Sequence, residues 1–400
     1  MARSTPRLDV DDATSDRFTH ERVIAITLVT EGDPDRISGG FLYQRRVAQR
    51  ALEHGVRLRM VSVPPGNLAR SFGVGLRVVR RAAANSDLVV VDSLASSSLA
   101  PWIALGAARG RLVGSVHQRP GGSGSPEVRR RLRRWLDLLA YRRCERIVVP
   151  SELLAEQLAA EGIERRSIGV AQPGCDVPER WTSGSAGPVG DLRSGRRAAL
   201  LCVANWVERK GILDLLDAVA GLDDDLVTLH LVGDENLDER FRARVLERLT
   251  RPDLVGRVER HGVVEPGRVP DYYAGADVFV LPSTEEPYGM VYAEALVAGL
   301  PVVGWRAGNL PNLVDDGVEG RLIPVGDVGA LRSVLATLAC DEEVRRTLGA
   351  AARSRAQQLP SWDQTAQVFF AICRHALTAA GSTRAATVSP TTTEIADESP

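Results

Sequence analysis

Two glutamates and a glycine within residues 282–296 have the spacing to hold an anion together with hydroxylated groups attached to it. The stretch reads PSTEEPYGMVYAEAL and follows the apolar run 276–281, which predicts a buried strand of a parallel sheet. The apolar residues after Gly289 predict a helix closed by Gly299. The first N–H groups of a helix have no partner within the helix and carry partial positive charge, so this junction attracts an anion.

The carboxylates Glu286 and Glu294 flank this predicted anion site, one in the loop before the helix and the other about a turn inside it. Because carboxylates repel a phosphate, we interpret them as acceptors for ribose and sugar hydroxyls. The N–H groups of Met290 and Val291 are the predicted phosphate ligands, and Gly289 lets the ligand approach the backbone. The alternative is one solvated glutamate and one cap, but an unpaired carboxylate is costly in the apolar helix around Glu294.

A single lysine stands near this stretch in the predicted fold. Of the 50 basic residues 49 are arginine, and Lys210 is the one lysine. Lys210 and Arg209 lie in a loop between a predicted strand, 198–204, and a predicted helix, 212–220. Both charges can therefore reach a diphosphate bound beside Gly289. Chance survival of one lysine and a solvated Arg209 are the alternatives.

The segment from Glu286 to Glu294, followed by ALVAGLPVV, resembles the E-x7-E segment of retaining nucleotide-sugar glycosyltransferases of family 4. The resemblance implies an α/β GT-B fold, with two Rossmann-like domains facing across a cleft and a C-terminal helix that crosses back to the first domain. It implies a nucleotide-diphosphate sugar as donor and a hydroxyl acceptor. No cofactor and no metal are expected, because the helix terminus and basic residues neutralise the leaving diphosphate.

The elements of the first half position further candidates. A strand at 23–30, a helix at 41–54 and a strand at 57–63 predict a βαβ opening. Gly39 and Gly40 follow the first strand, at the sheet edge where open parallel sheets bind ligands. The pair resembles the glycines that family members place near the donor phosphates and the acceptor. Asp33 in the same loop is an acceptor-side candidate, and a plain turn is the alternative.

Predicted strands at 88–92 and 112–116 end at Asp92 and just before His117. In the family a histidine at this strand end lies beside the transferred sugar, so the resemblance assigns His117 to the sugar and acceptor side. Asp92 is predicted to line the same cleft on the acceptor side. A structural or solvated histidine is the alternative for His117.

In the second half the resemblance places backbone groups near Gly262 and Val263 against the nucleobase. His117, Glu286 and Lys210 are the predicted catalytic residues. The chain departs from the family pattern at Asn205, where relatives usually carry an arginine, and at Asn312, where they usually carry a glutamate.

Composition shifts predict a disordered leader at 1–21, a linker at 181–196 and a disordered tail at 379–400. The resemblance implies that the parts between them are an acceptor-side Rossmann-like domain at 22–180, a nucleotide-sugar-binding Rossmann-like domain at 197–360 and a crossover helix at 361–378.

The composition also excludes several classes of protein. A formal net charge of −1 gives no general attraction to nucleic acid. Residues 1–22 are too polar for a secretory leader, and no apolar run is long enough to span a bilayer, so we expect a cytoplasmic protein. Five cysteines lie scattered without disulfide or metal-ligand spacing.

A predicted helix at 125–146 has a dense arginine face beside Leu132, Trp135, Leu136 and Leu139. Basic amphipathic helices can lie on anionic membranes, so one interpretation is peripheral contact with the inner membrane face. The other is a helix packed on the sheet with a solvated arginine face. Nothing in the sequence indicates an oligomeric state.

The main hypothesis is retaining glycosyl transfer from a nucleotide-diphosphate sugar to an acceptor hydroxyl by a front-face mechanism, in which the diphosphate oxygen helps to deprotonate the acceptor. A nucleotide-sugar 2-epimerase on the same fold is a second hypothesis. A non-catalytic sugar-nucleotide-binding subunit is a third, suggested by Asn205 and Asn312.

Overall fold

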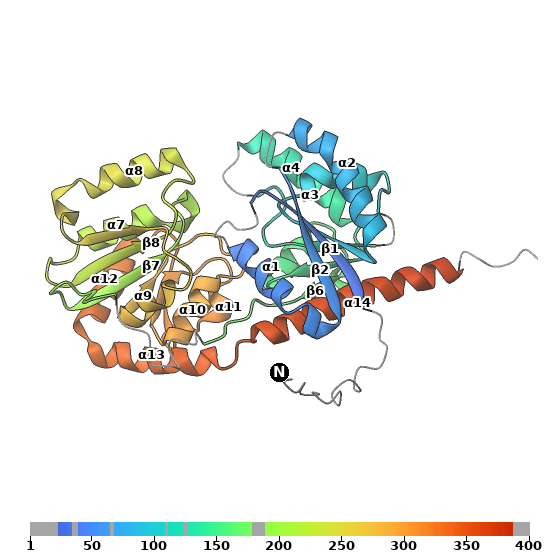
Figure 1. Cartoon of the computed structure of the whole chain (residues 1–400). Helices are drawn as coiled ribbons and strands as arrows, with labels where there is room; N and C mark the ends of the chain where they lie inside the picture. Colours follow the sequence, from blue (N-terminus) through green and yellow to red (C-terminus); the bar gives the residue numbers. More distant parts are fainter. Residues whose placement is uncertain are drawn as a thin grey trace, which may run out of the picture.

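Two parallel β-sheets, one in each half of the chain, form the frame of the molecule (Figure 1). The computed structural model describes residues 23–33, 39–64, 68–108, 111–122, 126–177 and 189–386. Each sheet has six strands with helices packed on it, so the predicted α/β class and GT-B fold are confirmed. The predicted leader lies outside the described residues.

The first sheet has the strand order β2-β1-β3-β4-β5-β6. Its third strand, LVVVD, is buried along its whole length, as expected for a parallel strand that is covered on both faces. The strands are β1 (Ile24–Glu31), β2 (Val56–Val63), β3 (Leu88–Asp92), β4 (Leu112–Ser115), β5 (Arg146–Val149) and β6 (Ile168–Val170). The helices are α1 (Gly39–Gln49), η1 (Leu52–His54), α2 (Leu68–Asn85), α3 (Ser96–Ala104), α4 (Glu127–Tyr141), α5 (Glu152–Ala160) and η2 (Arg165–Ser167).

The second sheet has the strand order β12-β11-β10-β7-β8-β9. Its strands are β7 (Ala198–Val203), β8 (Val227–Val232), β9 (Val258–Gly262), β10 (Val278–Val280), β11 (Val302–Trp305) and β12 (Gly320–Ile323). The helices are η3 (Glu208–Lys210), α7 (Ile212–Ala220), α8 (Glu239–Leu249), η4 (Pro252–Leu254), α9 (Val269–Gly275), α10 (Met290–Ala298), α11 (Leu310–Leu313), α12 (Val328–Cys340) and α13 (Glu342–Ala356). Because β7 and β10 are neighbours, the loops that follow them lie side by side.

The last helix, α14 (Trp362–Ala386), returns to the first sheet, as predicted (Figure 1). Its apolar face, which includes Trp362 and Phe370, is buried in the core of that sheet beside Ile26 and Leu28. The helix is longer than expected. The predicted tail from residue 379 is therefore wrong for 379–386, whose backbone continues the helix, and 387–400 lie outside the described residues.

Two segments of the chain cross between the halves next to each other. The N–H of Cys175 donates to the carbonyl of Pro360 at 2.9 Å, and the N–H of Trp362 donates to Oδ1 of Asp176 at 3.1 Å. The segment that leaves the first sheet is therefore hydrogen bonded to the segment that returns to it.

Two boundaries differ from prediction. The helix expected at 125–146 is α4, which ends at Tyr141, so the last arginines of the predicted basic face follow the helix. In the predicted linker, residues 181–188 lie outside the described part of the chain. Residues 189–196 pack on the second sheet, with Leu192 buried and Arg193 paired with Asp277 at 2.6 Å.

Within the described residues no helix has both the length and the apolar character needed to cross a membrane.

Candidate active site

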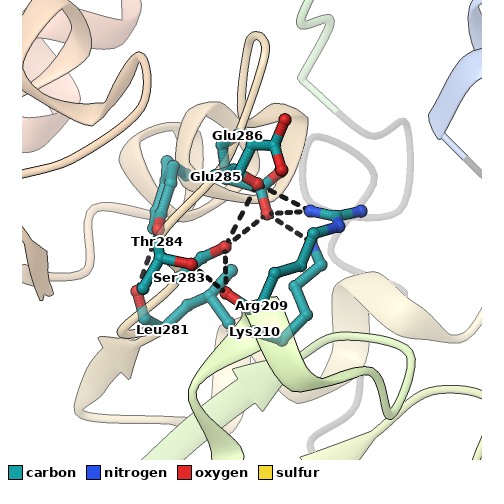
Figure 2. A network of polar contacts seen from close by, with 8 residues as sticks. Arg209, Lys210, Leu281, Ser283, Thr284, Glu285 and Glu286 are labelled. Atoms are coloured by element: carbon teal, nitrogen blue, oxygen red, sulfur yellow. Dashed lines mark hydrogen bonds and ion pairs between the residues drawn. The ribbon is translucent and has the colours of Figure 1, made fainter. Parts of the chain in front are cut away.

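One oxygen of Glu286 collects three hydrogen-bond donors (Figure 2). Lys210 Nζ lies 2.5 Å from Oε1, Ser283 Oγ donates to the same oxygen at 2.9 Å, and Arg209 donates from 3.1 Å. Glu286 is buried, with 8% of its surface exposed. The structure therefore places a carboxylate and two cations from neighbouring loops in direct contact.

The pKa of Glu286 is lowered from its ordinary value even though the side chain is buried. Burial alone raises the pKa of a carboxyl group, but the charges of Lys210 and then Arg209, together with hydrogen bonds from Lys210 and Ser283, outweigh this effect. Glu286 is therefore ionised at neutral pH, as a fixed negative charge beside two fixed positive ones.

Backbone contacts fix the loop of Arg209 and Lys210 against the loop of Glu286. The carbonyl of Arg209 accepts from Thr284 N at 2.8 Å and from Ser283 Oγ at 3.0 Å. Gly211 has φ 67°, and a Cβ there would lie 2.1 Å from the carbonyl oxygen of Pro282. Only glycine permits the backbone at position 211 to lie this close to Pro282. The loops after β7 and β10 are therefore packed directly on each other, and this packing positions Arg209 and Lys210 beside Glu286.

Helix α10 begins as predicted, directly after Gly289. Gly289 has φ 92°, and a Cβ there would lie 2.5 Å from the Tyr292 ring, so the backbone itself requires glycine. The N–H of Tyr292 bonds to the carbonyl of Gly289, whereas the N–H groups of Met290 and Val291 make no hydrogen bond to the described residues. These two N–H groups can hold an anion.

Glu294, inside α10, has a different environment from Glu286. Tyr273 OH donates to its Oε2 at 2.9 Å. Burial raises the pKa of Glu294 to about 7, although the bond from Tyr273 and the charge of Arg46 oppose the shift. Arg46 belongs to α1, so a charge in the first half of the molecule affects the pKa of this carboxyl group in the second half.

The first half brings its candidates to the start of α10. A Cβ on Gly39 would lie 3.7 Å from Sδ of Met290, and a Cβ on Gly40 would lie 3.9 Å from His117. His117 also packs edge-on against Tyr43, with 4.7 Å between ring centroids, and its Nε2 lies 3.1 Å from Ser115 Oγ. Burial lowers the pKa of His117 against the opposing charge of Asp92, so the imidazole is neutral at pH 7.

The two acceptor-side aspartates, Asp92 and Asp33, do not lie at the place where Gly39 approaches Met290. Asp92 is only 1% exposed, and its oxygens accept from Thr30 at 2.6 Å and from Ser93 at 3.1 Å. It therefore stabilises the carboxyl ends of β1 and β3 through buried hydrogen bonds. Asp33 is exposed in the loop after β1, and residues 34–38 of that loop lie outside the described residues.

Gly262 and Val263 lie at the end of the edge strand β9, which β7 and β8 separate from β10. The two asparagines that depart from the family pattern bond within the second half. Asn205 Oδ1 accepts from Asp234 N at 3.0 Å, and Asn312 Nδ2 donates to Asn309 Oδ1 at 2.9 Å.

Three contributors to the site were not predicted: Ser283, Tyr273 and Arg46. Ser283 precedes Glu286 by three residues in the same loop, so its position in the sequence was the available signal. Tyr273 and Arg46 come from other helices, and no local pattern points to them.

Two family profiles match this chain. The profile described as Glycosyltransferase Family 4 matches residues 19–179, and the profile described as Glycosyl transferases group 1 matches residues 197–341. Together they span most of the sequence. The chain belongs to the family 4 glycosyltransferases.

Curated relatives match over shorter stretches. A D-inositol 3-phosphate glycosyltransferase of Saccharomonospora viridis is 42% identical over 107 residues, which is 27% of this chain and 25% of the relative. A mannosylfructose-phosphate synthase of Agrobacterium fabrum is 27% identical over 251 residues, which is 59% of this chain and 54% of the relative. The chain thus spans between a quarter and about half the length of these relatives.

Two solved structures share the fold. Sucrose-phosphate synthase of Thermosynechococcus elongatus superposes with a TM-score of 0.76 at 20% identity, covering 89% of this chain and 100% of that one. HepE of Anabaena, in complex with UDP and glucose, superposes with a TM-score of 0.69 at 22% identity, covering 88% of this chain and 100% of that one.

Proposed function

We propose that this protein transfers a glycosyl group, with retention of configuration, from a nucleotide-diphosphate sugar to an acceptor hydroxyl. One observation carries the proposal: a lysine and an arginine are held on a buried carboxylate near a helix start whose first two N–H groups make no hydrogen bond within the described part of the chain. This arrangement offers positive charge for a leaving diphosphate and negative charge for the sugar. The HepE complexes with UDP and with UDP-glucose make UDP-sugars the first donors to test.

The proposed roles follow the charges. Lys210, Arg209 and the N–H groups of Met290 and Val291 stabilise the diphosphate as it leaves, and an ordered set of donors can do this without a resident cofactor or metal. Glu286 faces the sugar, where its negative charge favours an oxocarbenium-like transition state. Glu294 accepts from the ribose, and Gly262 and Val263 lie beside the nucleobase.

On the opposite side of the cleft, we assign His117, Gly39, Gly40 and Asp33 to the sugar and acceptor. The neutral imidazole of His117 can accept a hydrogen bond from a hydroxyl group. We propose a front-face reaction, in which the diphosphate oxygen takes the acceptor proton as the new glycosidic bond forms on the face from which the diphosphate leaves. The anomeric configuration is then retained.

The test begins with melting temperatures measured in the presence of UDP-, GDP- and ADP-sugars, because a ligand that binds only the folded state raises the melting temperature. The stabilising donor is then incubated with sugar and polyol acceptors, and the anomeric configuration of the product is read by NMR. A retained glycoside supports the proposal. An inverted product, or an epimerised sugar nucleotide formed from donor alone, contradicts it.

We also propose that α4 rests on an anionic membrane surface on the cytoplasmic side. Val128, Leu132 and Trp135 recur at helical spacing and are 82%, 47% and 59% exposed, so Leu132 and Trp135 of the predicted apolar stripe are not packed on the sheet. The helix sequence EVRRRLRRWLDLLAY surrounds them with arginines, whereas its Asp137 is buried. Exposed apolar side chains within an excess of positive charge fit anionic lipid headgroups.

Vesicle sedimentation tests this contact. The protein should pellet with vesicles of phosphatidylcholine and phosphatidylglycerol but not with phosphatidylcholine alone, and Trp135→Ser should weaken binding about tenfold. Leu105→Ser is the matched control, since Leu105 is 77% exposed on another helix end. Equal binding of both variants to anionic vesicles, or no binding by the unaltered protein, contradicts the proposal.

A further inference from the structure

Two histidines and a glutamate converge at the edge of the second sheet, on the neighbouring strands β8 and β9 rather than at the contact of Lys210 with Glu286. His230 lies on β8, and Glu259 and His261 lie on β9. Glu259 stands opposite His230 in the parallel register, and the pairing shifts between Leu231 and Val232. Residues two apart on a strand point to the same face, so Glu259 and His261 both reach His230.

The three side chains form a compact set of metal-ligating atoms. His230 Nδ1 lies 3.0 Å from His261 Nε2 and 3.7 Å from Glu259 Oε2, and the ligand atoms all lie within 4.8 Å of one another. A tetrahedral zinc ion with bonds of about 2.0–2.1 Å holds its ligand atoms roughly 3.3–3.4 Å apart. Shifts of a few tenths of an ångström would bring the two nitrogens to that separation.

Each of the three side chains is already held by a second partner. His230 Nε2 donates to the carbonyl of Leu192 at 2.6 Å, which leaves a lone pair on Nδ1 of the neutral ring. Glu259 Oε1 accepts from Ser194 Oγ at 3.0 Å, and His261 Nδ1 lies 3.2 Å from Tyr272 OH. Metal-bound histidines typically have such a partner on the other ring nitrogen, and it fixes which nitrogen faces the metal.

The backbone of Ser194 supports the same interpretation. Its φ of 48° makes Ser194 the one non-glycine residue with positive φ among those described. A serine in this left-handed conformation is costly and persists only where surrounding contacts hold it. Here it orients the carboxylate of Glu259. His230 is fully buried, whereas the Glu259 side chain is 46% exposed, so solvent can supply an entry path and a fourth ligand.

We propose that His230, Glu259 and His261 bind one divalent transition-metal ion of the zinc class. Imidazole nitrogen with one carboxylate oxygen suits Zn²⁺ and Co²⁺ better than Mg²⁺ or Ca²⁺. No net proton need leave His261, because the neutral ring moves its proton from Nε2 to Nδ1, where Tyr272 OH accepts it.

The proposed ion has a structural role and takes no part in the chemical step of the glycosyl transfer proposed above. Through Leu192 and Ser194 it would fasten the segment that enters the second half to the outer strands of its sheet. It would also fix the end of β9, where His261 precedes Gly262.

Cobalt titration of the full chain, prepared without a histidine tag and stripped with EDTA, tests the site. Visible absorption should show the intense bands of four-coordinate Co²⁺, saturating at about one equivalent per chain, and equimolar Zn²⁺ should displace them. Metal content after zinc loading, measured by mass spectrometry, should give the same stoichiometry, and Zn²⁺ should raise the melting temperature.

Variants connect the signal to these residues. His261→Gln should weaken metal binding at least tenfold, and Tyr272→Phe, which removes only an outer partner, about tenfold. His375→Gln is the matched control, because His375 is exposed on α14 and should leave binding unchanged. His230 is fully buried and its replacement could unfold the chain, so Glu259→Gln serves as the second test variant. The absence of the cobalt bands, or unchanged bands in folded His261→Gln, would overturn the proposal.

Discussion

The two glutamates on either side of the start of α10 have opposite electrostatic environments, although one short stretch of chain carries both. Glu286 touches two cations and a hydroxyl, and its pKa is lowered. Glu294 has one tyrosine hydroxyl as its direct partner, and its pKa rises to about 7. Burial favours the neutral form in both, so the difference lies in the charges that the neighbouring loops supply.

This difference separates two tasks. Glu286 is ionised at neutral pH and is hydrogen bonded to Lys210 and Arg209 without any ligand. Glu294 can change its charge near neutral pH, and its ionised form is the better acceptor for the ribose hydroxyls that we propose it binds. Four sets of variants test this difference between the two carboxyl groups.

Lys210→Ala should have the largest effect. It removes the closest cation from Glu286 and from the proposed diphosphate position, and we expect the transfer rate to fall about 10²- to 10³-fold, as when one preorganised donor is lost. Steady-state transfer with the donor found by thermal shift measures this. Arg244→Ala is the control, since Arg244 forms an exposed pair with Glu208 on the same loop. Equal rates in both variants would contradict the role of Lys210.

Glu286→Gln and Glu294→Gln should change the pH dependence of stability in opposite directions. The lowered pKa of Glu286 means that its ionisation stabilises the folded state above the pKa of the unfolded chain, and this contribution disappears as pH falls through the folded pKa. Glu294 favours the folded state below the unfolded pKa of about 4.5, and this contribution is lost as pH rises to about 7, amounting to about 3 kcal/mol.

Urea unfolding of the unaltered protein and both variants between pH 3 and 8 measures these contributions. The difference between unaltered protein and Glu294→Gln should fall with rising pH, whereas the difference for Glu286→Gln should grow. If the difference in the free energy of unfolding changed with pH in the same direction for both variants, the two carboxyl groups would not differ as described.

Gly289→Ala should destabilise the folded state by about 2–3 kcal/mol and weaken donor binding, because it adds both an unfavourable φ and an overlap with Tyr292. Gly256→Ala is a matched control, since Gly256 has φ 72° but no atom within 4 Å of an added Cβ. It should cost only about 1–2 kcal/mol. Chemical denaturation measures both, and equal losses would mean that the contact with Tyr292 contributes nothing.

Tyr273→Phe should have the smallest effect. It removes the hydrogen bond to the ionised form of Glu294 and should raise the pKa of that carboxyl group further above about 7, by about one unit. The carboxyl signal of Glu294, followed by NMR through the titration, measures the shift. A pKa that falls in this variant would assign the hydrogen bond to the protonated form instead.

The sequence revealed the parts of the fold and site that depend on short-range patterns. The apolar run before Pro282 and the glycines at 289 and 299 predicted the strand, loop and helix that the structure contains. Helices α2 and α3 lie where none was predicted. Helix α3 lacks a side-chain cap and contains Pro101, so the usual start signal is missing and a helix breaker interrupts the pattern.

The sequence predicted which residues of the site lie near one another, but it could not predict which of them form direct contacts over a long distance along the chain. Lys210 and Glu286 are 76 residues apart, and their contact depends on β7 and β10 being neighbours. A strand order of this kind is set by packing of the whole sheet. The cluster of His230 and His261 depends likewise on the irregular register of β8 and β9.

The paired crossing of the chain near Pro360 determines how the two halves can move. Because Cys175 and Asp176 of one segment are hydrogen bonded to Pro360 and Trp362 of the other, the described parts of both connections meet in one small region. We expect a rotation of one half against the other to be centred there, because a few residues between two packed bodies can absorb such a change. This rotation would separate Gly39 from Met290, which lie close to each other across the two halves.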